Sequence, residues 1–378
     1  MWRVRWRDAR GRNRSKAIGR KRDAEAFDAD LRRRRRLGEL DLLEGGSQTL
    51  ADFAEEWWQL YAAPNLAPKT LKNYAYVWDG HVLPRLGGFR LRELNAEVLE
   101  RFRADLHGAG AGEPTILKAL MLLQGILQHA VAWRRIAANP VKAVRKPRSR
   151  RLRAVRPLAP IVVERMRAHF IGRLTSRSHL NRGDYNHTRN QRDATLVSLL
   201  AYAGLRPQEA LALSWGAVRE RTILIERAAS MGEIRSTKGS GRTRTVRLLG
   251  PLAQDLAEWR LVCGRPDEDK LVLPDPSGQV WRGGQWQGWT TRNFSAAKAA
   301  AGAPDARPYD LRHSFVSLLI HEGLSIVEVA RQAGHNPTLT LDTYAHVFDE
   351  FDAAERVPAE AAIRQARDEL VPVSYRRA

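Results

Sequence analysis

The sequence predicts a multidomain, mainly helical protein: a small α+β module at the N-terminus, an all-α bundle, and a mainly α domain with a small antiparallel β-sheet. The length of 378 residues is typical of two or three domains. Hydrophobic residues make up 43% of the chain, which is enough for real cores and excludes wholesale disorder. Helical periodicity dominates, and strand-like runs occur only near the N-terminus and within the last domain.

The charge of the chain predicts a polyanionic partner. Lys and Arg number 63 against 42 Asp and Glu, so the formal net charge is +21, and 53 of the basic residues are arginines. A GC-rich coding bias explains why arginine outnumbers lysine, but it does not explain the excess of positive charge. We therefore expect nucleic acid as the partner, bound through phosphate contacts that weaken as salt rises. A membrane surface fits less well, because no basic amphipathic helix carries a continuous apolar face.

Composition also excludes several classes of protein. The single cysteine, Cys263, rules out an intrachain disulfide and a cysteine-rich zinc site. No uncharged apolar stretch approaches the ~18–20 residues that a membrane span needs. Charges interrupt every apolar pair at the N-terminus, so it does not resemble a signal peptide. We expect a soluble cytoplasmic protein associated with the nucleoid.

Residues 1–46 predict a module of two strands and one helix. Arg3, Arg5 and Arg7 alternate with apolar residues, which is the period-two pattern of a half-buried strand. A return strand is expected over 13–18, and a helix from about Asp23 that ends in a run of arginines, as suits the helix dipole. The three strand arginines could enter a DNA groove or could form a solvated outer face, and the pattern alone does not decide between them.

Residues 47–141 predict a helical bundle. Four helix starts are marked by capping residues or by a proline at the first helical position, namely Thr49 with Asp52, Pro68, Asn95 and Thr115. Asn139-Pro140 ends the block. The apolar stripes of these helices predict core packing rather than a cofactor site.

Residues 142–156 predict a basic linker. The segment 145–156 holds seven basic side chains and no acid, and its proline discourages a helix. A solvated linker would explain this composition, but we favour a strap that lies on the DNA backbone. Its candidate DNA-binding residues are Arg145, Lys146, Arg148, Arg150 and Arg151.

Residues 157–350 predict the largest domain. Helices are expected at 158–170 and 193–203, with a long exposed loop over 172–192 between them. Three strand-like runs follow, at Thr222 to Glu226, Ile234 to Lys238 and Arg244 to Leu248, and the connector Gly239-Ser240-Gly241 predicts a hairpin between the last two. Helices return from 251, and 351–378 read as a C-terminal helix and a basic tail.

Four short segments of this domain stand out by their order and spacing. They are Ala203-Gly204-Leu205-Arg206-Pro207-Gln208-Glu209, then Ser236-Thr237-Lys238-Gly239, then Tyr309-Asp310-Leu311-Arg312-His313-Ser314-Phe315, and finally Ala333-Gly334-His335 with Tyr344 nine residues after the histidine. Each segment is weak evidence alone. The set in this order is specific.

Together these segments resemble the tyrosine recombinase (phage integrase) family over about 170–350. The N-terminal module resembles the arm-type DNA-binding domain of integrases, and 47–141 their core-binding domain. The resemblance implies a bacterial or phage-encoded site-specific recombinase that cuts and rejoins DNA through a 3′-phosphotyrosine intermediate, integrating or excising a mobile element. It implies no cofactor and no metal.

The resemblance also implies a role for each motif residue. Arg206 and Arg312 would bind the phosphate oxygens, since guanidiniums bind in bidentate fashion and stay protonated at any working pH. Tyr344 would be the nucleophile, and because a free phenol has a pKa of about 10, the cationic site must favour its phenolate. Lys238 would be the general acid for the leaving 5′ oxygen, with Arg242 or Arg244 as stand-ins.

The remaining motif residues would support these groups. His335 would hydrogen-bond the phosphate or orient the nucleophile, and Glu209 would hold Arg206 in place. The family usually has His or Lys three residues before its second arginine, where this chain has Tyr309. A phenol can donate a hydrogen bond but brings no charge, so we expect a supporting role and a slower chemical step. Tyr309 is also a rival nucleophile.

Because Tyr309 departs from the family pattern, a second function stays open, that of a catalytically weak or inactive sequence-specific DNA-binding regulator. The recombinase reading predicts a homotetramer on double-stranded DNA, because joining two duplexes takes four strand exchanges. A host DNA-bending protein or an excision factor is a possible further partner. The segment 351–378 would dock into a neighbouring protomer, with an intramolecular lid or a frayed tail as the alternatives.

Overall fold

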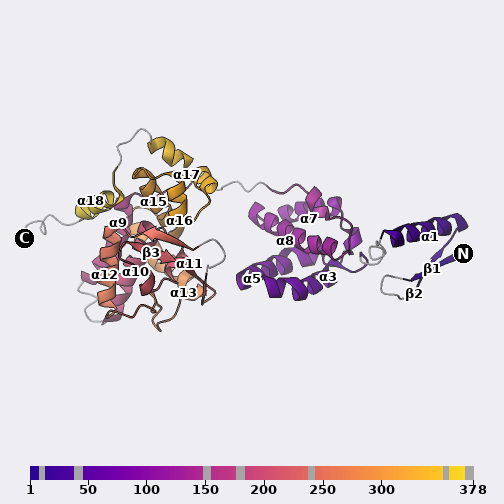
Figure 1. Cartoon of the computed structure of the whole chain (residues 1–378), viewed down its shortest axis with the longest axis horizontal. Helices are drawn as coiled ribbons and strands as arrows, with labels where there is room; N and C mark the ends of the chain where they lie inside the picture. The colour runs from indigo at the N-terminus through magenta and orange to yellow at the C-terminus, as the bar shows by residue number, and fades with distance from the viewer. Residues whose placement is uncertain are drawn as a thin grey trace, which may run out of the picture. The chain divides into compact units, whose positions relative to one another are not determined.

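The computed structural model describes residues 1–7, 13–37, 46–147, 155–175, 184–236, 243–351 and 357–370. The chain forms two compact units, residues 1–152 and 153–378, whose elements are drawn in Figure 1. Both units are mainly helical, and the strands form three small two-stranded antiparallel sheets. The predicted fold class is confirmed.

The N-terminal module is a β-hairpin with one helix packed on it. β1 (Trp2–Arg7) pairs antiparallel with β2 (Asn13–Ile18), and α1 (Lys21–Arg36) follows. Trp6 contacts Phe27 of α1 edge to face, with ring centroids 5.6 Å apart. Trp6 is therefore half-buried against the helix, while Trp2 on the same face and the three arginines of the strand are exposed.

The helical bundle begins with the expected caps. Its elements are α3 (Leu50–Trp57), η1 (Trp58–Ala62), α4 (Ala63–Asn65), α5 (Pro68–Val77), η2 (Trp78–Val82), α6 (Leu83–Leu86), η3 (Leu91–Glu93), α7 (Ala96–Gly108), α8 (Glu113–Ala132) and η4 (Pro140–Ala143). Thr49 and Asp52 form a capping box, and Asn95 caps α7. The prediction for Thr115 is wrong, since α8 starts earlier with Pro114 in its first turn, where no backbone N–H is needed.

Helix α8 is the core helix of the bundle. It is the one helix among the described residues that is long and apolar enough to cross a membrane by length and composition. In the structure its apolar side chains, such as Leu120, Leu123 and Leu127, are fully buried against the other helices of the unit. Core packing therefore accounts for its composition.

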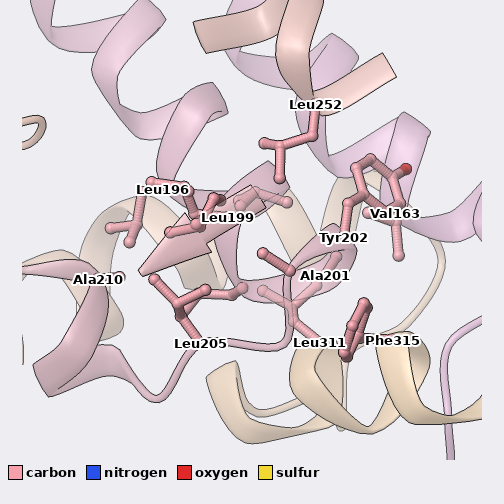
Figure 2. Packing of buried hydrophobic residues seen from close by; sticks show 14 of the residues in the cluster. Val163, Leu196, Leu199, Ala201, Tyr202, Leu205, Ala210, Leu252, Leu311 and Phe315 are labelled. Atoms are coloured by element: carbon pink, nitrogen blue, oxygen red, sulfur yellow. The ribbon is translucent and has the colours of Figure 1, made fainter. Parts of the chain in front are cut away.

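The second unit holds the remaining elements. They are α9 (Pro160–Thr175), α10 (Asp184–Tyr202), α11 (Pro207–Ala210), η6 (Trp215–Ala217), β3 (Thr222–Ile225), β4 (Arg227–Ser230), β5 (Glu233–Ser236), β6 (Arg244–Arg247), α12 (Gly250–Val262), α13 (Gly283–Gly288), η7 (Trp289–Phe294), α14 (Ser295–Ala300), α15 (Pro308–His321), α16 (Ile326–Ala333), α17 (Pro337–Phe351) and α18 (Ala359–Leu370). Apolar side chains of α9, α10, α12 and α15 meet in one core, part of which is shown in Figure 2.

The strand pairing differs from the prediction. β5 pairs with β4 rather than with β6, and β6 pairs with β3. The turn between β4 and β5 is Met231-Gly232, and both residues have positive φ angles of 55° and 83°, as a tight two-residue hairpin turn requires. The sequence analysis missed β4 and took Gly239-Ser240-Gly241 for the turn. That connector lies outside the described residues.

The predicted exposed loop at 172–192 is wrong at both ends, because α9 continues to Thr175 and α10 starts at Asp184. The described polar side chains near the start of α10 contact polar and aromatic partners instead of the apolar core. Arg192 stacks over the Trp281 ring at 4.5 Å, and Arg189 donates to Asn293 at 3.2 Å. A search for apolar periodicity does not detect such a face.

The C-terminal helix α18 docks on its own subunit. Ile363 is fully buried, and Arg367 pairs with the buried carboxylates of Glu164 in α9 and Asp255 in α12, at 3.3 and 2.8 Å. The Gly250 backbone N–H donates to Glu360 at 3.0 Å. Within the described residues, α18 therefore takes an intramolecular position, and docking into a neighbouring protomer stays a prediction.

Candidate active site

The first motif forms a tight turn that places Arg206 at the start of α11. Gly204 has a φ of +59°, and a Cβ there would lie 2.2 Å from the Phe315 ring, so only glycine fits. Arg206 follows as the N-cap residue of α11. Its guanidinium donates to Glu209 and to the Gly334 carbonyl oxygen, both at 2.8 Å. This turn therefore links the first motif to the last one.

Glu209 binds a second arginine that the sequence analysis named only as a stand-in. Arg244, on β6, donates to both carboxylate oxygens of Glu209 at 2.8 and 2.7 Å, and to the Gln332 carbonyl oxygen at 2.9 Å. Burial alone would raise the pKa of Glu209, but the hydrogen bonds and charge of Arg244, with those of Arg206, lower it to about 2. Glu209 is thus a buried anion between two guanidiniums.

The third motif places Arg312 in the interior on α15. Its side chain is 1% exposed and donates to the carbonyl oxygens of Gly204 and Ala333. Burial, together with the nearby charges of Arg206 and Arg244, lowers the pKa of Arg312 to about 9. Arg312 remains a cation at neutral pH, but its charge lacks full compensation.

The fourth motif contributes His335 just after α16. Gly334 ends that helix in the left-handed conformation, with a φ of +63°, and a Cβ there would lie 3.0 Å from the Arg244 side chain. His335 Nε2 lies 2.9 Å from Arg312 Nη2. An argininium can only donate, so Nε2 accepts and the ring proton is assigned to Nδ1. This Nδ1 has no hydrogen-bond partner among the described residues.

We call Arg206, Arg244, Arg312, Glu209 and His335 the cationic cage. It combines three guanidiniums with one carboxylate. Burial and the charges of the arginines lower the pKa of His335 to about 3, so this imidazole is neutral and adds no charge. The cage therefore carries an excess of positive charge in a largely buried place, which favours an anionic ligand.

Tyr344 lies next to the cage, where it contacts His313, the residue that follows Arg312 in the chain. The tyrosine, on α17, is 0% exposed, and its hydroxyl hydrogen-bonds to Nδ1 of His313. The two ring centroids are 5.6 Å apart. His313 is close enough to the cage for its charge to lower the pKa of His335. His313 stood in a quoted motif but had no predicted role.

Tyr309 occupies a different position from Tyr344. It is 44% exposed, and its ring centroid lies 6.3 Å from that of His313, one helical turn away on α15. Its charged form would interact with Arg312. Tyr309 therefore borders the cage on its solvent side.

The other predicted residues lie elsewhere. Lys238, Arg148, Arg150 and Arg151 lie outside the described residues. Arg3, Arg5 and Arg7 are exposed on the N-terminal hairpin, and Arg145 and Lys146 are exposed at the end of the bundle, where Lys146 donates to Gln124. Within the described part of the chain, no cluster of His, Cys, Asp and Glu could hold a metal ion.

Two family models match the chain. Residues 174–350 match the phage integrase family, and residues 49–107 match the N-terminal SAM-like domain of phage integrases. Tyrosine recombinase XerC of Mycobacterium leprae is 28% identical over 266 residues, which cover 69% of this chain and 82% of that protein. An integrase of Streptomyces ambofaciens is 26% identical over 314 residues, covering 77% of this chain and 74% of that protein.

Solved structures of low sequence identity share the fold. The Tn1549 transposon integrase in complex with transposon right end DNA superposes with a TM-score of 0.63 at 16% identity, covering 85% of this chain and 99% of that chain. A lambda integrase tetramer bound to a Holliday junction gives a TM-score of 0.54 at 14% identity, covering 88% and 92%.

Proposed function

This chain belongs to the phage integrase family of tyrosine recombinases, which are site-specific DNA recombinases, and we propose that it integrates and excises a mobile element through a 3′-phosphotyrosine intermediate. The observation that carries the proposal is the cationic cage, where three guanidiniums face a single carboxylate. A scissile phosphodiester would supply the missing negative charge. The lowered pKa of Arg312 would then return toward its usual range.

In the proposed reaction the Tyr344 oxygen attacks the phosphorus of one strand. The bond from Tyr344 to phosphorus forms, the bond from phosphorus to the 5′ oxygen breaks, and Lys238 gives that oxygen a proton. The 5′ hydroxyl of the partner strand later attacks the phosphotyrosine and releases Tyr344. The phosphodiester energy is conserved throughout, so no external energy source is needed.

The cage would stabilise the pentacoordinate phosphorus of both steps. Arg206 and Arg312 would donate to its equatorial oxygens, and His335 would donate through its Nδ1 proton. Arg244 would act indirectly, by holding the carboxylate of Glu209 with both of its terminal nitrogens. Since Tyr344 and Arg312 are sealed from solvent in the free subunit, DNA binding would have to open this face.

The rest of the chain would bring DNA to the cage. We assign 1–46 as an arm-type module, 47–141 as the core-binding domain, 142–156 as the basic linker, 157–350 as the catalytic domain and 351–378 as the C-terminal segment. The exposed hairpin arginines and the linker would bind phosphates. We propose that four protomers assemble on DNA, with α18 exchanging its intramolecular position for one on a neighbour, and that the protein works in the cytoplasm.

A nicked suicide substrate tests the proposal. Cleavage of such a DNA releases a short fragment that diffuses away, so an active recombinase stays covalently attached and migrates slowly on a denaturing gel. We expect this adduct for the wild type and for Tyr309→Phe, and none for Tyr344→Phe. Loss of the adduct only in Tyr309→Phe would reverse the assignment of the nucleophile. A salt-sensitive complex without any adduct would favour the DNA-binding regulator.

A further inference from the structure

The hydrogen bond between His313 and Tyr344 assigns a catalytic role that the motif residues leave open. We propose that His313 accepts the proton of the Tyr344 hydroxyl while this oxygen attacks the phosphorus. The proposal rests on the proposed function, because it concerns the same nucleophile. Its basis is the direct contact of His313 Nδ1 with the only tyrosine hydroxyl that is both buried and beside the cage among the described residues.

The direction of this hydrogen bond follows from the proton that each group carries. The Tyr344 hydroxyl has one proton to donate, and its oxygen lies against Nδ1 of His313. A neutral His313 with its proton on Nε2 presents a lone pair at Nδ1. Tyr344 then donates, and its proton already points at the acceptor.

Substrate binding reverses the electrostatic balance at the moment of attack. The phosphodiester brings one negative charge into the cage, and a further charge develops on the equatorial oxygens in the transition state. Both favour a positive charge on His313, so the proton can move from Tyr344 to Nδ1 as the bond to phosphorus forms. The 5′ oxygen takes its proton from Lys238, and on religation His313 returns its proton to Tyr344.

Neither Tyr309 nor His335 is suited to accept the proton of Tyr344, so the base must be another residue. The phenol of Tyr309 borders the cage, but a neutral phenol donates a proton far more readily than it accepts one. His335 is also a poor candidate, because its Nε2 lone pair is taken by Arg312. His313 is partly exposed, whereas the tyrosine whose hydroxyl it contacts is buried.

Two assays that both depend on the cationic cage distinguish a role of His313 in proton transfer from a role in supporting the structure. Cleavage of a nicked suicide substrate requires Tyr344 to lose its proton. Ligation of a strand that ends in a 3′-p-nitrophenyl phosphate requires the cage but not Tyr344, since nitrophenolate leaves without needing a proton. The ligation is measured in a Tyr344→Phe background, which prevents attack by the tyrosine itself. His313→Asn keeps a hydrogen-bond acceptor close to the Nδ1 position but cannot take a proton at neutral pH, and His313→Ala removes both.

We expect both His313 variants to slow cleavage by about 10²–10⁴-fold, the usual effect of losing a general base, and to leave nitrophenyl ligation unchanged. Cleavage by His313→Asn at the wild-type rate would overturn the proposal, because a hydrogen bond alone would then suffice. Equal loss of cleavage and ligation would also overturn it, since His313 would then only support the fold. If the wild type forms no adduct and Tyr344→Phe does not ligate, the proposed function itself fails.

Discussion

Arg312 in the second unit and Arg5 in the N-terminal hairpin are the same amino acid in opposite physical settings. Arg312 is buried, and its guanidinium is fixed by the carbonyl oxygens of Gly204 and Ala333. Arg5 is exposed on a two-stranded sheet. Fixed buried donors can stabilise a transition state without reorganising, whereas exposed ones contribute mainly screened attraction to phosphate. In a chain with 53 arginines, burial and fixed geometry therefore separate the expected catalytic arginines from the expected binding ones.

The largest effect is expected on the free energy of unfolding, when a buried arginine is removed from its ion pairs. Arg167 pairs with Glu164 and Asp255 inside the second unit. Arg167→Ala leaves these carboxylates with Arg367 as their one cationic partner among the described residues, beside the hydroxyls of Ser198 and Tyr202, so the free energy of unfolding should fall by about 3–5 kcal/mol. Urea denaturation of the full chain measures this. A change below about 1 kcal/mol, as is usual for surface pairs, would show that burial does not distinguish this arginine.

Arg312→Gln should reduce catalysis rather than binding. Removal of one fixed donor at a developing oxyanion slows reactions by about 10²–10³-fold, so we expect this loss in the rate of adduct formation. DNA affinity should change little, because Arg312 would contact a single phosphate, whereas the exposed arginines of the other regions would contact several. Single-turnover cleavage and a filter-binding assay separate the two effects. An equal loss in affinity would contradict the distinction between the two regions.

The protonation of Glu209 makes the stability of the fold around the cage depend on pH. The pKa of this carboxyl is lowered from 4.5 to about 2 in the folded protein, so its stabilising contribution is complete above pH 4.5 and is lost as the pH falls toward 2. The shift corresponds to roughly 3 kcal/mol. Glu209→Gln should lower the free energy of unfolding at pH 7 and flatten its dependence between pH 4.5 and 2. Identical acid unfolding of variant and wild type would contradict the buried anion.

The exposed hairpin arginines should affect binding only. Replacing Arg3, Arg5 and Arg7 with glutamine should reduce the slope of log affinity against log salt by about 0.9 for each phosphate that these arginines neutralise in the wild type. Cleavage of a suicide substrate that carries only the core site should keep its wild-type rate. An unchanged salt slope would mean that this face is a solvated surface, which is the alternative that the sequence left open.

The smallest effect is expected for an exposed ion pair. Arg32 and Asp28 on α1 are 2.6 Å apart but largely exposed. Arg32→Ala should change the free energy of unfolding by less than about 0.5 kcal/mol, since such pairs lie in water and are screened by salt. Urea denaturation of this variant and of Arg167→Ala compares the loss of stability at an exposed ion pair with the loss at a buried one. A loss as large as that of Arg167→Ala would remove the distinction.

The sequence predicted the fold class and the main part of the cage for physical reasons. The motif glycines mark backbone positions that disfavour a side chain, since Gly204 packs on Phe315 and Gly334 ends a helix in the left-handed conformation. These turns aim Arg206 and His335 at Arg312. Caps such as Thr49 and Asn95 were visible because a helix start needs local hydrogen-bond acceptors.

The residues that the sequence analysis missed depend on tertiary pairing. The importance of Arg244 comes from the pairing of β6 with β3, which a search for hairpin signals assigned to a different partner. His313 was visible in its motif, but its contact with Tyr344 depends on how α17 packs against α15. The polar start of α10 was read as a loop because its partners are Trp281 and Asn293 rather than an apolar core.

The most direct test of the account is to identify the residue that carries the DNA. The covalent adduct trapped on a nicked suicide substrate is digested with protease and nuclease, and the peptide that bears the nucleotide is sequenced by mass spectrometry. We predict a phosphodiester on Tyr344, the tyrosine held against His313 beside the cationic cage. A nucleotide on Tyr309, or on any residue outside α17, would contradict the account.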